Sequence, residues 1–202
     1  TTMKKRSTVT KLIALVICTM ILIQNCFAVG ISQENIIPDT DSETAYLICR
    51  NGGEFSNMSM KTPKSTEMIK EISVGGKSVW QLNNSGTVYP YLYFDVAESM
   101  KNSAYDGSEY TIEVDYYDSG NGLLRLYYDS YTNTKKTAET VYTNKENKWK
   151  TLKVTLDDAE FAKKCDNKCD ISVSIAIQSI SSIVGTESIA VSEIRVKRYA
   201  AK

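Results

Sequence analysis

The sequence has 202 residues, its 24 lysines and arginines equal its 24 aspartates and glutamates, and it contains no histidine. The balanced charge argues against a nucleic-acid-binding protein, because such proteins carry a basic footprint. The lack of histidine excludes Ser-His and Cys-His nucleophile schemes and removes the side chain that most often acts as general base. We therefore expect a protein that is not an enzyme.

The first predicted element is a secretory signal peptide at residues 1–28. Basic residues at positions 4–6 precede an apolar run at residues 12–23, and this order is typical of a signal. As a helix the run spans about 18 Å, too short for a hydrocarbon core about 30 Å thick. We expect cleavage after Ala28 and a secreted, extracellular chain without a membrane span. A lipoprotein acylated at Cys26 is the weaker alternative.

A flexible linker and one domain are expected after the signal. Residues 29–44 are polar and are predicted to form the linker. Residues 45–202 are predicted to form the domain, which is long enough for a sizeable core. One helical turn is expected at 157–164. Turn-bounded stretches predict strands at 45–50, 71–74, 78–82, 91–96, 110–117, 124–128, 152–156, 171–177 and 189–196.

Most of these stretches alternate between apolar and polar side chains, as strands with one buried face do. Tyr110, Tyr116 and Tyr128 lie in the apolar phase, so we expect them in the core. In the last stretch the apolar phase changes from odd positions at Val191 to even positions at Ile194, which predicts a β-bulge. Short strands at this spacing predict an all-β fold, an antiparallel β-sandwich or jelly roll.

Three cysteines remain after signal removal, an odd number for an oxidising compartment. Cys165 and Cys169 flank a predicted loop tip and are expected to form a small disulfide. So short a loop would add only about 2 kcal/mol of stability. Cys49 is expected to be a buried free thiol. Two thiols without further cysteine or histidine partners are too few for a zinc site.

A series of short motifs in the second half of the domain resembles a known family. The motifs are Tyr93–Val96, Tyr110–Asp118, Ser119–Gly122, Leu126–Ser130, Lys148–Leu152, Leu156–Phe161 and Ile194–Val196. In this order they are similar to galactose-binding-like β-jelly-roll modules, which resemble carbohydrate-binding modules found beside glycosidases in secreted bacterial proteins. The resemblance covers about residues 88–198. It implies a polysaccharide or oligosaccharide ligand and a separate glycosidase as a partner. Cys165 and Cys169 depart from the family pattern.

Exposed aromatic side chains are the candidate sugar-binding groups, because tyrosine combines an apolar ring with a polar tip. The candidates are Trp80, Tyr89, Tyr91 and Tyr131, with Trp80 equally open to a place in the core. Arg125 points away from the apolar phase of its strand, where it can donate paired hydrogen bonds to hydroxyls or a uronate. A cross-strand ion pair with Glu113 or Asp115 is the plainer alternative for Arg125.

A further hypothesis concerns a metal ion. Asp118 and Asn121 in a glycine-containing turn are candidate ligands of a structural calcium ion, although the pattern is also ordinary turn chemistry. No other cofactor is expected.

A structural or adhesive cell-surface β-sandwich with a protein partner is the alternative function. A carboxylate-dependent glycoside hydrolase is a third, which needs two facing carboxylates about 5 to 10 Å apart.

Overall fold

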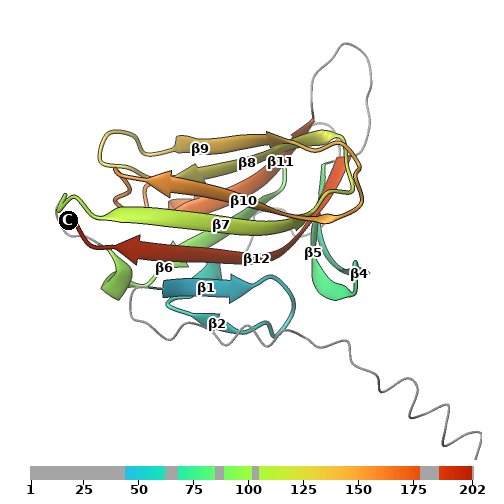
Figure 1. Cartoon of the computed structure of the whole chain (residues 1–202), viewed down its shortest axis with the longest axis horizontal. Coiled ribbons are helices and arrows are strands. Elements are labelled where there is room, and N and C mark those ends of the chain that lie inside the picture. The colour runs from blue at the N-terminus through green and yellow to red at the C-terminus, as the bar shows by residue number, and fades with distance from the viewer. Residues whose placement is uncertain (1–43, 62–67, 85–88, 102–104, 178–186, 202) are drawn as a thin grey trace, which may run out of the picture. The chain divides into compact units, whose positions relative to one another are not determined.

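Two antiparallel β-sheets face each other in the computed structural model of this chain (Figure 1). The structure describes residues 44–61, 68–84, 89–101, 105–177 and 187–201, which all belong to one compact unit, Asp39–Lys202. The predicted signal peptide and almost all of the predicted linker lie outside the described residues. Among the described residues, no helix is long and apolar enough to cross a membrane.

The seven-stranded sheet is organised around its longest strand, β12. The strand order is β10-β7-β12-β1-β2, and β5 also pairs with β12 and with β4. The strands are β1 (Thr44–Ile48), β2 (Phe55–Ser56), β4 (Ile69–Val74), β5 (Lys77–Asn84), β7 (Glu109–Tyr117), β10 (Trp149–Leu156) and β12 (Glu187–Tyr199). The register of β12 against β7 shifts between Val191 and Glu193, which confirms the predicted bulge.

The five-stranded sheet has the order β3-β6-β11-β8-β9, so β11 is its central strand. The strands are β3 (Met58–Lys61), β6 (Tyr91–Val96), β8 (Gly122–Tyr128), β9 (Lys136–Tyr142) and β11 (Ile171–Ile177). Neither β3 nor β9 was predicted, nor was the two-residue β2. All three are edge strands, and they lack the clear alternation that marks the others.

A single apolar core fills the space between the sheets. It combines Ile112 and Val114 of the seven-stranded sheet with Leu124 and Val173 of the five-stranded sheet, all fully buried. The tyrosines expected in the core, Tyr110, Tyr116 and Tyr128, are buried as well. Alternation of apolar and polar residues along each strand decides which side chains face this core. The predicted antiparallel β-sandwich is therefore confirmed.

The helical turn predicted at 157–164 is wrong. Phe161 and Lys163 have φ angles of 54° and 61°, in the left-handed region that ends a right-handed helix. The conformation serves two contacts: Phe161 is buried edge-on against Tyr110, with ring centroids 4.8 Å apart, and the Lys163 amide donates to Asp170 over 2.8 Å. The only helical turn described in this part of the chain is a 3-10 turn, η3, at Asp166–Lys168.

Two buried aspartates anchor the loop formed by residues 157–170. The carboxylate of Asp170 accepts hydrogen bonds from the amides of Val96 (2.9 Å) and Lys163 (2.8 Å). The carboxylate of Asp129 accepts one from the Lys164 amide (2.9 Å). Burial raises the pKa of both groups, that of Asp129 to about 6 from 3.8. The other carboxylate oxygen of Asp129 has no hydrogen-bond partner within the described structure.

We expect Asp129→Asn to stabilise the fold at neutral pH. An acid whose pKa is raised by folding contributes stability below its ordinary pKa, and that contribution is lost as the pH rises through the folded pKa. Between pH 4 and pH 7 the free energy of unfolding should therefore shift by about 2–3 kcal/mol in favour of the variant. Urea unfolding at both pH values measures the shift. The exposed Asp157→Asn is the control, and a constant difference between wild type and Asp129→Asn would contradict the assignment.

Candidate functional site

The outward face of the five-stranded sheet carries an ordered group of tyrosine, serine and arginine side chains. Ser172 of β11 lies between Tyr93 of β6 and Tyr127 of β8. One row further along, Ser174 lies between Tyr91 and Arg125. Because side chains two apart on a strand share a face, all of these groups point away from the core. We call this surface the tyrosine face: Tyr91, Tyr93, Tyr127 and Arg125 around Ser172 and Ser174.

The three tyrosine rings of this face form one cluster. Tyr91 and Tyr93 are stacked, with ring centroids 5.7 Å apart and planes at 10°. Tyr127 reaches Tyr91 from the other side of β11, with centroids 6.3 Å apart and a tilt of 41°. The serines between them are small, and both are almost wholly buried. The rings therefore close over the central strand, with Tyr91 and Tyr127 half-buried and Tyr93 buried beneath them.

A lysine from the loop before β9 lies on the cluster. The ammonium of Lys135 is 4.9 Å from the ring centroid of Tyr91 and 4.7 Å from that of Tyr127. It forms an ion pair with Asp166 of η3. Burial lowers the pKa of Lys135, but the hydrogen bond to Asp166 and the charges of Tyr91, Asp166 and Tyr127 together outweigh it, so the net pKa is raised. Lys135 therefore remains a cation, held over the rings by Asp166.

Tyr93 rests on the two cysteines of the 157–170 loop. Tyr93, Cys165 and Cys169 form a separate buried apolar cluster. Both cysteines are free thiols, so the predicted disulfide is absent from the structure. The loop is closed by backbone hydrogen bonds instead, from the Cys165 amide to Cys169 O (3.1 Å) and from the Lys168 amide to Cys165 O (3.0 Å). Cys49 is also a free and buried thiol, as expected, and burial raises its pKa.

Arg125 is the polar group at the edge of the tyrosine cluster. It faces outward between Ser174 and Thr140 of the neighbouring strands. The alternative pairing with Glu113 or Asp115 is wrong, because those carboxylates lie on the other sheet. Glu113 there binds Arg195 (2.8 Å) and Lys153 (2.7 Å) instead. The outward orientation of Tyr91 and Arg125 matches the sequence analysis, and their role as ligand-binding groups stays a prediction.

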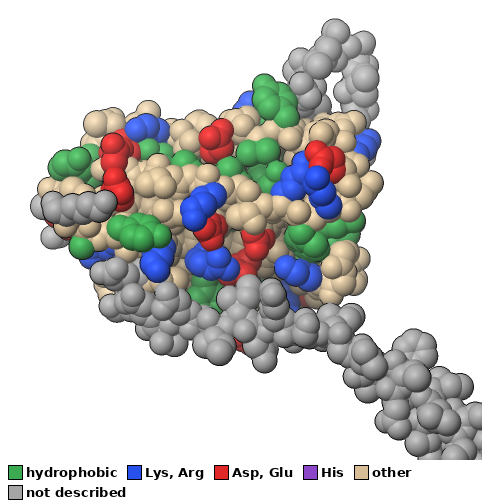
Figure 2. Space-filling view, in the orientation of Figure 1, with side chains coloured by type: hydrophobic (Ala, Val, Ile, Leu, Met, Phe, Trp, Pro, Cys, Tyr) green, Lys and Arg blue, Asp and Glu red, His purple; other side chains and the backbone are tan. Residues whose placement is uncertain are grey.

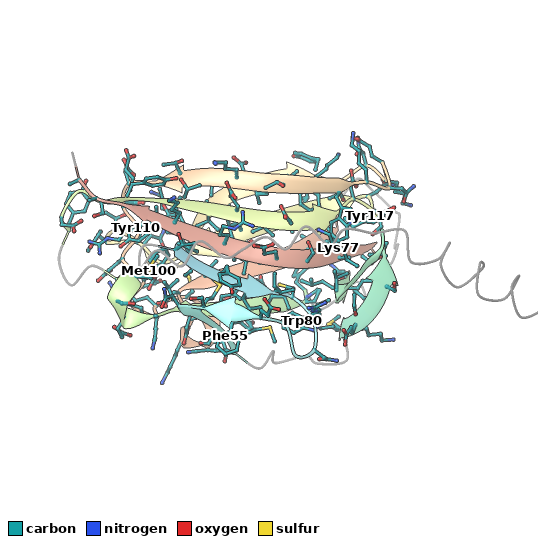
Figure 3. All side chains as sticks on the ribbon, turned by 60° about the horizontal axis from the view of Figure 1, so that its bottom comes forward. Phe55, Lys77, Trp80, Met100, Tyr110 and Tyr117 are labelled. Carbon is teal, nitrogen blue, oxygen red and sulfur yellow. The ribbon has the colours of Figure 1, made fainter. Side chains whose placement is uncertain are left out.

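Trp80 does not belong to this surface. It lies on β5 of the other sheet, in register with Val191, and packs against the core while partly exposed (Figure 3). Its strand has buried residues in both phases, Val79 and Leu82. Alternation alone therefore leaves the direction of Trp80 undecided, and the structure favours the core.

Tyr131 and Tyr89 also lie apart from the cluster. Tyr131 packs edge-on against Tyr105, with centroids 5.3 Å apart, and its hydroxyl is buried without a described hydrogen-bond partner. The charged groups around it are Glu160, Asp106 and Arg198, none of which lies on the tyrosine face. Tyr89 is 46% exposed ahead of β6 and has no described ring contact. The structure therefore places Tyr91 and Arg125 on one face and Trp80 and Tyr131 elsewhere.

Two tyrosines of the site, Tyr93 and Tyr127, were missed at the sequence level. Tyr93 shares its phase with Tyr91, and Tyr127 shares its phase with Arg125. That shared phase was the available signal. It could not show that β11 places a pair of small serines between β6 and β8, which is what allows the rings to meet.

The predicted calcium site is not formed. The carboxylate of Asp118 is fully buried and accepts hydrogen bonds from the amides of Asn144 (3.0 Å) and Lys145 (3.1 Å). Its other oxygen pairs with the Lys150 ammonium at 2.7 Å. Donors and a cation thus surround the oxygens that calcium would need, and Asn121 is exposed. Within the described residues, no group of three or more acidic or cysteine side chains is arranged to hold a metal.

We expect Asp118→Asn to lower the free energy of unfolding by about 1–3 kcal/mol, the range for losing a hydrogen bond between charged groups. Calcium and chelator should leave the melting temperature of the wild type unchanged, because Lys150 already neutralises Asp118. Thermal melts of both proteins with calcium or with EDTA measure this. A calcium-dependent rise in melting temperature that is lost in the variant would restore the calcium site.

Comparison with known proteins finds similarity to solved structures, but not to family models or curated proteins. No protein-family model matches the chain, and no curated protein matches it. A mutant carbohydrate-binding module of family 29 is 13% identical, over 78% of this chain and 94% of that chain, with a TM-score of 0.45. A family 29 module from Piromyces equi is 11% identical, over 76% of this chain and 91% of that chain, also with a TM-score of 0.45.

A third similar structure is a family 29 module mutant complexed with mannohexaose. It is 13% identical to this chain, covers 78% of this chain and 94% of its own, and has a TM-score of 0.41. All three of these similar structures are described as carbohydrate-binding modules of family 29.

Proposed function

We propose that this protein binds a glycan on its tyrosine face and does so without catalysis. The observation that carries the proposal is the cluster of Tyr91, Tyr93 and Tyr127 on the outside of a sheet, with Arg125 beside it. Burying an aromatic side chain in the core would stabilise the fold, so a group of them on an outward face is typical of a binding surface.

The chemistry of the face suits a sugar. One side of a pyranose ring presents C–H bonds that pack on an aromatic ring, while hydroxyl groups at its rim need hydrogen-bond partners. Tyr91 and Tyr127 offer both an apolar ring and a phenolic hydroxyl. Arg125 offers five N–H donors. The groups stand on adjacent strands of one sheet, so their spacing is held by the ladder of backbone hydrogen bonds.

Lys135 must give way for a sugar to reach the faces of Tyr91 and Tyr127. Its ion pair with Asp166 is partly exposed, and such pairs contribute only about 0–1 kcal/mol. A cation over an aromatic ring at an exposed site adds about 0.5–1 kcal/mol. The lysine stem is flexible, so the ammonium can swing to the rim of the face and donate to sugar hydroxyls there.

On the opposite surface, carboxylates are held in pairs with basic and hydroxyl side chains. On the seven-stranded sheet, Glu113 and Asp115 are engaged by Arg195, Lys153 and Thr151. Acidic and basic side chains lie next to each other there in the view of Figure 2. The hydrogen bond to Lys153 lowers the pKa of Glu113, so this carboxylate is poorly suited to act as a general acid. These pairings disfavour the hydrolase hypothesis.

We expect Tyr91→Ala and Tyr127→Ala each to weaken glycan binding by about 1–2 kcal/mol, roughly tenfold, because each removes an aromatic surface from the ligand. The matched control is Tyr199→Ala, which removes an exposed tyrosine from the seven-stranded sheet. Titration against a panel of polysaccharides, with melting curves in parallel, measures both effects. If the wild type binds no glycan, the adhesive alternative takes first place.

We also propose that the protein is exported and that its signal is cleaved after Ala28. The basic start and the apolar run at residues 12–23 support this proposal. Expression of the full chain should then yield extracellular protein that begins at Val29. Mass spectrometry of the intact secreted protein determines its N-terminus. Recovery of only uncleaved, membrane-bound chain would contradict the proposal.

A further inference from the structure

Arg125 stands out among the basic residues of the five-stranded sheet because it makes no ion pair with any described residue. Lys61 pairs with Asp95 at 3.2 Å, and Lys135 pairs with Asp166. Asp95 and Asp166, two carboxylates near the tyrosine face, are therefore already neutralised. Arg125 is left as its one uncompensated charge among the described residues.

The surroundings of Arg125 favour an anion as the missing partner. Its side chain is only partly exposed, with Ser174 and Thr140 on the flanking strands and Tyr127 two residues along β8. Removing a cation partly from water is unfavourable unless a charge or a hydrogen-bond acceptor compensates. Hydroxyl groups alone would compensate incompletely, because a guanidinium binds a carboxylate through two parallel charge-assisted hydrogen bonds.

The distance from Arg125 to the rings is right for one sugar unit. Residues two apart on a strand have Cα atoms about 7 Å apart, so a sugar packed on Tyr127 brings its ring substituents within reach of the Arg125 side chain. Tyr91 lies across Ser174 on the other side. A carboxylate on the sugar ring would thus meet the guanidinium while the C–H face meets the tyrosines.

We infer that the tyrosine face binds an anionic glycan, with a uronate carboxylate on Arg125 and the sugar rings on Tyr91 and Tyr127. The inference rests on the proposed glycan-binding function and names the class of sugar. Lys135 already lies over the same two rings as a cation, and it can exchange the carboxylate of Asp166 for one of the glycan. The rigid fork of arginine distinguishes a planar carboxylate from neutral hydroxyl groups at the same ring position.

The test compares each acidic polymer with its own neutral derivative. Polygalacturonate and polymannuronate are titrated against the full-length secreted protein in calcium-free buffer, alongside their methyl esters, which keep the backbone and lose the charge. Wild type should bind at least one acid about tenfold more tightly than its ester, the effect expected of a charge-assisted pair. Arg125→Gln should remove that preference, because it should weaken binding of the acid by more than it weakens binding of the ester.

The control is Arg50→Gln, which makes the same change in net charge at a partly exposed position outside the tyrosine face. It should keep the preference for acid over ester. Melting curves confirm that Arg125→Gln is folded, and Arg125→Lys, which keeps the charge without the fork, should retain only part of the preference.

Other outcomes separate this inference from the function on which it rests. Equal binding of acid and ester, or binding of neutral glycans alone, overturns the anionic assignment and leaves glycan binding in place. Binding of dextran sulfate as tight as that of the uronate polymer, and equally dependent on Arg125, overturns the carboxylate assignment in favour of any polyanion. If the protein binds no acidic glycan and no neutral glycan, both the anionic assignment and the proposed glycan-binding function are overturned.

Discussion

The arrangement around the tyrosine face depends on the buried carboxylate of Asp170. It lies directly before β11 and accepts amide hydrogen bonds from the end of β6, at Val96, and from the loop, at Lys163. It also pairs with Lys101 at 3.1 Å. A charge buried this deeply is tolerated because its oxygens are satisfied and a cation is near. Together with the contact of Asp129 to the Lys164 amide, these contacts fix the loop at 157–170 against the sheet.

Through that loop the anchor reaches the tyrosine face. The loop places Cys165 and Cys169 beneath Tyr93 and places Asp166 where it can hold Lys135 over Tyr91. Burial, with Asp166 nearby, raises the pKa of Tyr93 to about 12, so this phenol remains a protonated, supporting member of the cluster. The face therefore combines rigid strand-borne groups with one lysine that can move.

The two outer faces of the sandwich arrange their exposed side chains differently. The seven-stranded sheet pairs acids with bases across its strands, as in the contact of Arg195 with Glu113 at 2.8 Å. The five-stranded sheet instead gathers aromatic rings around a charge without a described partner, Arg125. Cross-strand pairs stabilise a sheet in both cases. The seven-stranded sheet has an aromatic pair of its own, Tyr117 and Trp149, with Lys77 over the Trp149 ring.

The sequence alone determined the class of fold and the direction of many side chains. Alternation with a period of two residues placed Tyr110 and Tyr128 in the core and Tyr91 and Arg125 outside, and a change of phase marked the bulge in β12. These features are local, because the pleat of a strand fixes them whatever its neighbours are. The same logic failed for Trp80, whose strand is buried in both phases.

Only the tertiary structure decided which strands lie side by side. The order β6-β11-β8 brings together Tyr91 and Arg125, which are 34 positions apart in the chain, and sets Ser174 of β11 between them. The tertiary structure also decided that Asp118 pairs with Lys150 and that backbone hydrogen bonds close the loop between Cys165 and Cys169. Strand order depends on long-range packing across the core, and no short-range pattern in the sequence records it.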